Sequence, residues 1–238
     1  TVTLSNSGSA TVTFTPVVNV NGVTTTLSPV TLAPGQTVSS APISVPLTTT
    51  GATVTASVTG ASVPDANLGN NSDTETSGAL FADVTTEVDL PANGVAGSTV
   101  SGTVVFTNSA AAGATATAVT GTVSLSNGQV ITYNVGTLTV GQSVTYTFTT
   151  TVPATTGTVL EVTSTVATAT PETNTANNQD VDNAAGGEQL TPLFADPGVN
   201  VQPIPSGTAG STVTTTVTLS NSGSATVSFT PVVVVNGV

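Results

Sequence analysis

The stretch STVSGTVVFTN, residues 98–108, alternates apolar and polar residues almost without a break. A period of two places one set of side chains on a buried face and the other in solvent, as in a half-buried β-strand. SVTYTFTTTVP at 143–153 and TVLEVTSTVATATP at 158–171 continue the alternation. Amphipathic helical spacing is not found along the chain, so the sequence predicts strands joined by turns.

Turn signals separate these strands. VNVNGVTTT at 18–26 and SLSNGQVITY at 124–133 each contain the Asn-Gly step of a tight hairpin. LAPGQTV at 32–38 and LTVGQSV at 138–144 occupy equivalent places and indicate turns that precede a strand. Roughly six to eight strands in a domain of about 105 residues predict an all-β fold, namely tandem immunoglobulin-like antiparallel β-sandwiches. Cys and Trp are absent, so we expect a core of Val, Leu, Ile and Phe with Tyr133 and Tyr146.

The chain contains a long internal repeat. Residues 216–238 match residues 1–23 except at two positions, where Ser228 replaces Thr13 and Val234 replaces Asn19. A weaker repeat relates the segment that begins LFAD at Leu80 to the segment that begins LFAD at Leu193. Because repeats of this length are whole structural units, we expect two alternating domain types.

These repeats predict three parts. Residues 1–77 form a sandwich of a second type without its first strand, and 78–188 form a complete sandwich of a first type. Residues 189–238 form the N-terminal part of the next second-type sandwich. We therefore expect the given sequence to start and stop in the middle of a domain.

The composition excludes several functions. The chain has no Lys, Arg, His, Cys, Met or Trp, and its net charge is −12. Without Lys or Arg it cannot neutralise phosphates, so we expect neither nucleic-acid binding nor attraction to an anionic membrane. Disulfides, isopeptide bonds to lysine, His-ligated zinc and His-based triads are excluded by the same absences. No apolar run is long enough for membrane insertion.

Four motifs recur in order in both domain types. Each domain has FAD at its start, then N-S-G or N-S-A, then L-x-P-G-Q or L-x-V-G-Q. PDANLGNNSD at 64–73 or PETNTANNQD at 171–180 closes the domain. This set resembles the immunoglobulin-like tandem repeats of bacterial and archaeal surface proteins, namely the cell-adhesion-related repeat domain and its relatives in giant secreted proteins. The resemblance implies a tandem β-sandwich array at the cell surface, with no catalytic residues in the matched motifs.

All twelve acidic residues lie in two stretches, at the end of one predicted domain and the start of the next. Carboxylates without cationic partners repel one another, and a hard cation such as calcium would relieve that repulsion. Solvated linker charge is the simpler interpretation, and it stays open. The predicted calcium ligands are Asp65, Asn67, Asp73 and Asp83 at one junction and Glu172, Asn174, Asp180 and Asp196 at the other.

Other interpretations have weaker support. The high content of Thr, Ser and Pro is also typical of a disordered, glycosylated stalk. The alternation of apolar and polar residues and the Asn-Gly turns between the predicted strands argue against disorder. Paired carboxylates suit glycosidases, yet here they are confined to domain edges. Threonine arrays bind ice only when they form flat, regularly spaced surfaces. Asn70 begins one glycosylation sequon, Asn70-Asn71-Ser72. No loop is long or aromatic enough for an adhesin tip that binds a ligand.

We therefore predict a non-enzymatic structural segment of an extracellular fibre or surface stalk. Its partners would be neighbouring repeats or copies of itself, and its localisation would be extracellular, at the cell surface. The alternative is a subunit of a self-assembling filament or sheath in which chains join by strand exchange.

Overall fold

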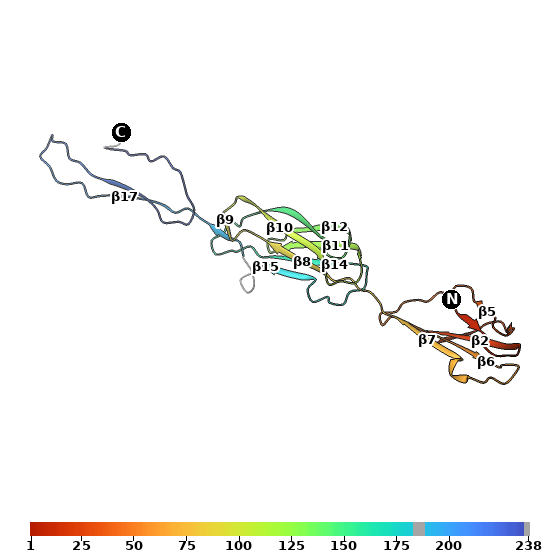
Figure 1. Cartoon of the computed structure of the whole chain (residues 1–238). Coiled ribbons are helices and arrows are strands. Elements are labelled where there is room, and N and C mark those ends of the chain that lie inside the picture. Colours follow the sequence, from red (N-terminus) through yellow and green to blue (C-terminus); the bar gives the residue numbers. More distant parts are fainter. Residues whose placement is uncertain (183–188, 236–238) are drawn as a thin grey trace. The chain divides into compact units, whose positions relative to one another are not determined.

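The computed structural model describes residues 1–182 and 189–235, and nearly all of its regular structure is β-strand. It divides into two compact units, Thr1–Leu80 and Phe81–Val238, which are described separately (Figure 1). Among the described residues, the one helical element is a 3-10 turn at Leu68–Asn70, and no helix is long and apolar enough to cross a membrane.

The unit Phe81–Val238 contains a complete β-sandwich. One sheet has three antiparallel strands in the order β13 (Ser143–Thr151), β10 (Thr99–Asn108), β8 (Val84–Asp89). The alternating stretch that predicted a strand is β10, and it pairs on both edges. The opposite sheet has four strands in the order β12 (Val130–Leu138), β11 (Ala116–Leu125), β14 (Val162–Ala167), β15 (Gln179–Asp182).

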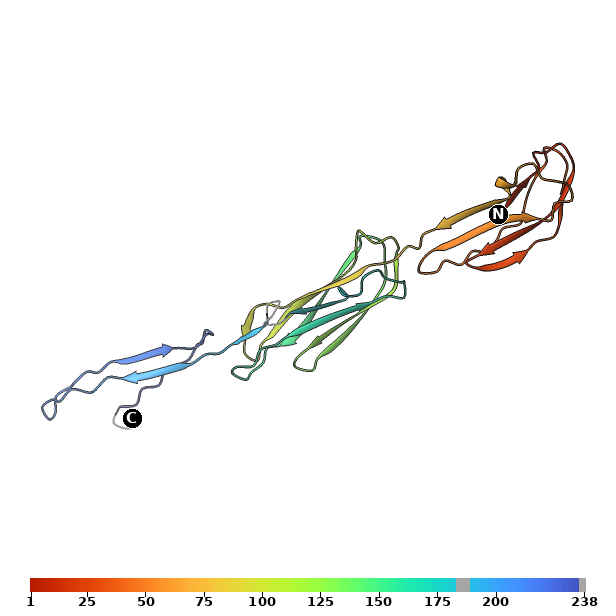
Figure 2. The same cartoon turned by 90° about the horizontal axis from the view of Figure 1, so that it is seen from below.

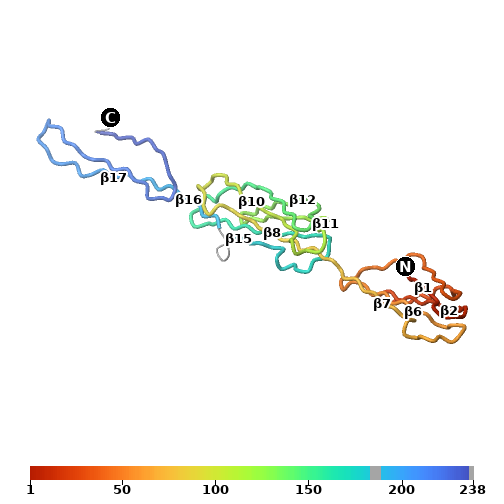
Figure 3. Tube along the Cα trace, viewed as in Figure 1, coloured from red at the N-terminus to blue at the C-terminus, as the bar shows by residue number. Residues whose placement is uncertain are grey.

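Inward-facing residues of both sheets form one core. Val104 and Phe106 of β10, Val123 of β11 and Val162 of β14 are fully buried, as the alternation requires. The immunoglobulin-like sandwich is therefore held by apolar packing, with neither a disulfide nor a tryptophan. Its strands can be followed in the tube view (Figure 3).

The Phe106 ring packs against Gly121 on the facing sheet. A Cβ added at Gly121 would lie 2.0 Å from the nearest ring atom of Phe106. The ring also meets Tyr133 and Tyr146, with centroid separations of 5.8 and 6.1 Å. The predicted tyrosines thus join the core, where they are partly buried.

The Tyr133 hydroxyl is buried and has no hydrogen-bond partner among the described residues. Burial raises the pKa of Tyr133, and the neighbouring Tyr146 raises it further. Because the pKa of Tyr133 is higher in the folded than in the unfolded state, its protonation stabilises the fold below about pH 10. This contribution is lost as the pH rises through the folded-state pKa.

We expect Tyr133→Phe to leave the free energy of unfolding at neutral pH unchanged or to raise it by about 1 kcal/mol, because an unsatisfied hydroxyl is removed. The variant should also lose less stability than the wild type above pH 10. Melting temperatures measured from pH 7 to 11 check both points, with Tyr146→Phe as the matched control. A clear loss of stability at neutral pH would show that the hydroxyl has a stabilising partner.

The unit Thr1–Leu80 is less fully packed. Its larger sheet has the order β3 (Val23–Thr26), β2 (Val12–Val20), β6 (Ala52–Thr59), β7 (Ser72–Ser77), and β4 (Val30–Leu32) also pairs with β2. A separate sheet has two strands, β1 (Thr3–Ser5) and β5 (Thr37–Ser39). The buried cluster is small and consists of Leu4, Phe14 and Leu32.

The two Asn-Gly steps that predicted tight hairpins form different connections. Asn21 and Gly22 both have positive φ, at 51° and 89°, as a tight two-residue hairpin requires, and they join β2 to β3. At 127–128 only Gly128 has positive φ, and the connection between β11 and β12 spans residues 126–129. The hairpin predicted there is confirmed, but it closes through a longer loop than the tight turn we expected.

The C-terminal part of the second unit forms two small pairings. β16 (Thr191–Leu193) lies parallel to β9 (Asn93–Val95) at the edge of the sandwich. β17 (Pro197–Val201) and β18 (Val217–Asn221) pair antiparallel beyond it (Figure 2).

Candidate functional site

The outer edge of β8 is lined by carboxylates. Glu172 accepts a hydrogen bond from the backbone amide of Val84 at 3.1 Å. Asp180 accepts from Val88 at 2.7 Å, and Asp182 accepts from Leu90 at 3.2 Å. Asp180 and Asp182 belong to β15, a strand of the opposite sheet, and Glu172 lies in the loop that precedes β15.

This arrangement follows from the position of β8 in its sheet. β8 pairs with β10 along one edge, so alternate amides along its other edge have no strand to bond. Exposed strand edges invite pairing with other chains. Charge-assisted bonds from the carboxylates occupy these amides and fasten the two sheets together at this side.

Two asparagines complete the row. Asn177 donates to Asp83 at 3.0 Å, and Asn178 donates to Glu172 at 3.1 Å. Asn177 therefore joins the closing motif to an acidic residue at the start of the same domain, and Asn178 holds Glu172 within the motif itself. The motif PETNTANNQD thus binds the outer edge of β8, the first strand of its own sandwich.

We expect Asp180→Ala to destabilise the sandwich by about 1–3 kcal/mol, because the Val88 amide loses its acceptor in a partly buried position. Hydrogen exchange measured by mass spectrometry should quicken in peptides that contain β8. Glu87→Ala is the matched control, since Glu87 lies on the same strand and faces solvent. Equal exchange in both variants would contradict the role of Asp180 in holding the outer edge of β8.

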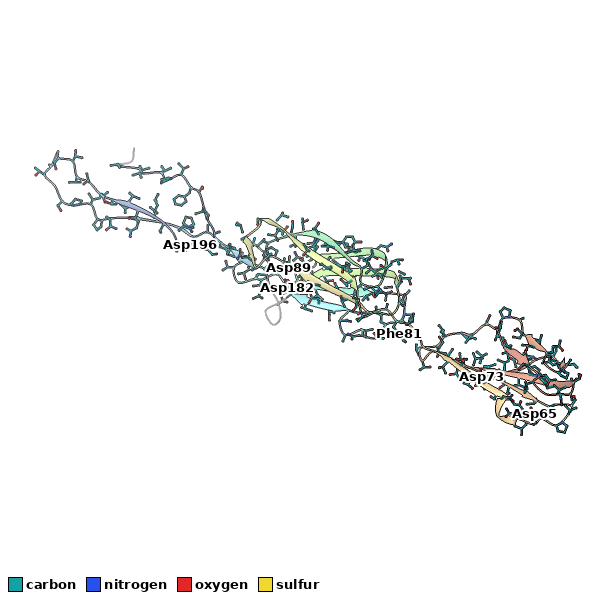
Figure 4. All side chains as sticks on the ribbon, viewed as in Figure 1. Asp65, Asp73, Phe81, Asp89, Asp182 and Asp196 are labelled. Carbon is teal, nitrogen blue, oxygen red and sulfur yellow. The ribbon has the colours of Figure 1, made fainter. Side chains whose placement is uncertain are left out.

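The predicted calcium ligands have other partners in the structure. Asp65 accepts from the amide of Asn67, Asn67 caps the 3-10 turn through the amide of Gly69, and Asp73 accepts from the amide of Thr74. These three lie in the unit Thr1–Leu80, whereas Asp83 lies in the other unit. Asp65 and Asp73 are labelled in Figure 4.

At the second junction Glu172 and Asp180 bond amides of different residues of β8, and Asn174 accepts from Ala176. Asp196 accepts from the Ser222 hydroxyl at 2.9 Å. In the described part of the chain, no group of three or more Asp and Glu side chains converges on one point that could hold a metal. Glu188, also in this acidic stretch, lies outside the described residues.

Calcium at the junctions therefore stays a prediction. Melting curves recorded with calcium and with chelator test it, because a cation that binds the folded junction raises the melting temperature.

A buried asparagine ends β10 in the complete sandwich, and another directly follows β1 in the unit Thr1–Leu80. Asn108 is fully buried and donates to the carbonyls of Ala114 and Leu138, both at 3.0 Å, while it accepts from the Asp83 amide at 3.2 Å. Asn6 makes the corresponding bonds to Ala10 and Leu32. The N-S-G and N-S-A motifs thus tie three segments of the fold together.

Sequence reasoning missed the roles of Asn108 and Asp182. The recurrence of Asn at positions 6, 108 and 221 was the available signal for the first. For Asp182, the signal was its spacing of two residues from Asp180, which places both side chains on one face of a strand.

The unit Thr1–Leu80 has an open cleft of about 450 Å³ beside β1, β6 and β7. Its lining includes Val2, which precedes β1, and Leu4 of β1. Val54 of β6 and the acidic residues Asp73 and Glu75 of β7 also line it. Apolar and polar residues line the cleft in similar proportion, and Asp73 and Glu75 are the acidic ones among them.

The fold defines the chain as a protein of immunoglobulin-like β-sandwich class. No family model and no curated protein matches it. Among solved structures it is similar to the CARDB domain of a Pyrococcus furiosus protein, whose NMR structure has 18% identity over 48% of this chain and 96% of that one, with a TM-score of 0.39.

A crystal structure of that CARDB domain in complex with di-metal ions gives 21% identity over 47% of this chain and 88% of that one, with a TM-score of 0.38. Red sea bream transglutaminase gives 13% identity over 71% of this chain and 26% of that one, with a TM-score of 0.30. These likenesses are distant, and they transfer no ligand or activity to this chain.

Proposed function

We propose that the chain is a structural segment of an extracellular fibre or surface stalk built from tandem β-sandwich repeats, with no catalytic role. The observation that carries this proposal is a repeated strand pair. β8 pairs with β10 so that Val84 opposes Asn108, and β17 pairs with β18 so that Pro197 opposes Asn221. Both residues of the second pair stand 113 positions after their counterparts (197 against 84, 221 against 108).

The chemistry of the site supports a mechanical role. In the sandwich, the carboxylates of Glu172, Asp180 and Asp182 accept backbone amides along a strand edge, where they hold the two sheets together. Such bonds resist separation of the first strand, through which a pulling force on the N-terminal side of the sandwich acts. Extracellular placement at a cell surface belongs to the same proposal.

Immunogold electron microscopy of intact source cells, with antibodies raised against the whole chain, tests this function. Label along surface fibres or stalks is the expected result. Label that needs permeabilised cells would overturn the extracellular proposal, and hydrolysis of a polysaccharide by the purified chain would overturn the non-catalytic one.

A further inference from the structure

Two pairings in the complete sandwich run parallel, and both join its first segment, residues 82–95, to its last segment, residues 172–182 and 189–193. β9 pairs parallel with β16, and an isolated parallel bridge joins Ala82 to Glu172. Among the described residues, every other strand pairing and isolated bridge is antiparallel. The two parallel pairings lie near opposite ends of the first segment.

Carboxylate bonds connect the same two segments between these pairings. Three backbone amides of the first segment donate to side chains of the last, in the pairs Val84 to Glu172, Val88 to Asp180 and Leu90 to Asp182. The residue numbers of donors and acceptors rise together. The first and last segments therefore run in the same direction along this side of the sandwich.

The end of the last segment is fixed on two sides. Leu190 is fully buried, and it exchanges two backbone hydrogen bonds of 3.0 Å with Leu160. Two further backbone bonds, both of 2.9 Å, join the last segment to the first, from the Thr191 amide to the Ala92 carbonyl and from the Ala96 amide to the Leu193 carbonyl. The chain thus leaves the sandwich from a segment that is bonded to its surroundings up to its final residue.

A pull between the two ends of this sandwich loads the segments in shear. The chain enters at Phe81, before the first segment, and leaves after Leu193, at the opposite end of the sandwich (Figure 1). Because the segments run in the same direction, the pull draws them past each other along their common axis. Evenly spaced bonds across a parallel pair then share the load, whereas peeling from one end breaks them in turn.

We propose that the first and last segments form a shear clamp, a set of cross-bonds that resists a pull between the two ends of the sandwich far better than a pull that peels β16 from β9. The proposal rests on the proposed structural function and adds the direction in which the repeat is strong. The backbone pairing of β9 with β16 is one part of the shear clamp. The carboxylates of Glu172, Asp180 and Asp182 are the other part.

The carboxylates extend the shear clamp to a place where backbone pairing is not available. β8 and β15 belong to different sheets, so they share no ladder of backbone bonds. Asp180 and Asp182 are two residues apart on β15, which places both side chains on the face toward β8. Hydrogen bonds to an ionised acceptor are about twice as strong as neutral ones, so a few of them replace a longer ladder.

Force measurements with optical tweezers on the full chain test the direction of strength. The protein has no cysteine, so a pair of introduced cysteines defines the two points of pull. The exposed sites of Leu80→Cys/Ala195→Cys lie on either side of the sandwich and load the segments in shear. The exposed sites of Thr99→Cys/Ala195→Cys both follow the end of the β9–β16 pair and peel it apart. At one loading rate, the first rupture should need a several-fold larger force in shear than in peeling.

Asp180→Ala, added to both cysteine pairs, distinguishes the shear clamp from general stability. The rupture force in shear should fall, because the Val88 amide loses its acceptor. The first rupture in peeling should keep its force, because peeling breaks the bonds of β16 before any load reaches β15. Glu87→Ala is the matched control, since Glu87 is exposed on β8, and it should leave both forces unchanged.

Equal rupture forces for the two cysteine pairs would overturn the proposal, and this comparison needs no change in the core. A loss of equal size in both directions for Asp180→Ala would also overturn it, because a merely weakened fold has that effect. Immunogold labelling reads where the chain resides and does not depend on rupture force. The proposed function and the shear clamp can therefore fail separately.

Discussion

Asn108→Ala is expected to destabilise the complete sandwich by about 3 kcal/mol or more, the largest effect of any polar substitution proposed for this chain. The side chain is fully buried and bonds the Asp83 amide and the carbonyls of Ala114 and Leu138. Alanine leaves all three backbone groups without this partner, and the interior gives them little access to water.

Thermal unfolding of the full chain measures this effect, and the transition of the sandwich should fall by roughly 10 °C or more. Asn221→Ala is a control supplied by the repeat, because Asn221 stands in the same motif but is exposed. Asn108→Asp tests the assignment further, since a carboxylate would face two carbonyl oxygens in place of the donating amide. A loss for Asn108→Ala no larger than that for Asn221→Ala would contradict the assigned role.

Gly121→Ala is expected to cost about 3 kcal/mol, because the core is already filled at that point. The added Cβ would lie 2.0–2.6 Å from three atoms of the Phe106 ring. Phe106 is fully buried, so its ring has nowhere to move without displacing Tyr133 or Tyr146.

A double-mutant cycle in the full chain gives this prediction a sharp test. Phe106→Leu removes the ring that meets the new methyl group, so the double variant should lose less stability than the sum of the two single losses. Gly78→Ala is the control, since a Cβ there meets nothing within 4 Å. Strictly additive losses would mean that Gly121 is required for some reason other than the approach of the ring.

Local patterns predicted the strands and one tight turn because they depend on short-range geometry. The alternation at 98–108 predicted β10, since inward and outward positions follow from a period of two. Asn21-Gly22 predicted its hairpin because both residues accept positive φ. At 127–128 the same dipeptide closes a longer loop, because the pairing of β11 with β12 begins outside the dipeptide.

The partners of the acidic residues could not be read from the sequence. Clustering along the chain indicated mutual repulsion among carboxylates, and calcium was a reasonable remedy. The structure shows a different arrangement for Glu172, Asp180 and Asp182. They bond amides of β8 and of Leu90, the residue after it, and so join residues about 90 positions apart. Pairings over such separations depend on strand order, which a single sequence does not reveal.

The central claim is that residues 193–238 and residues 1–80 hold complementary portions of one domain type. The most direct test is the melting temperature of a protein in which residues 193–215 directly precede residues 1–80, compared with residues 1–80 alone. The account predicts one cooperative transition that lies roughly 10 °C or more above that of the shorter protein, because β17 fills the cleft and buries Val199 and Val201. Equal melting temperatures for the two proteins would contradict it.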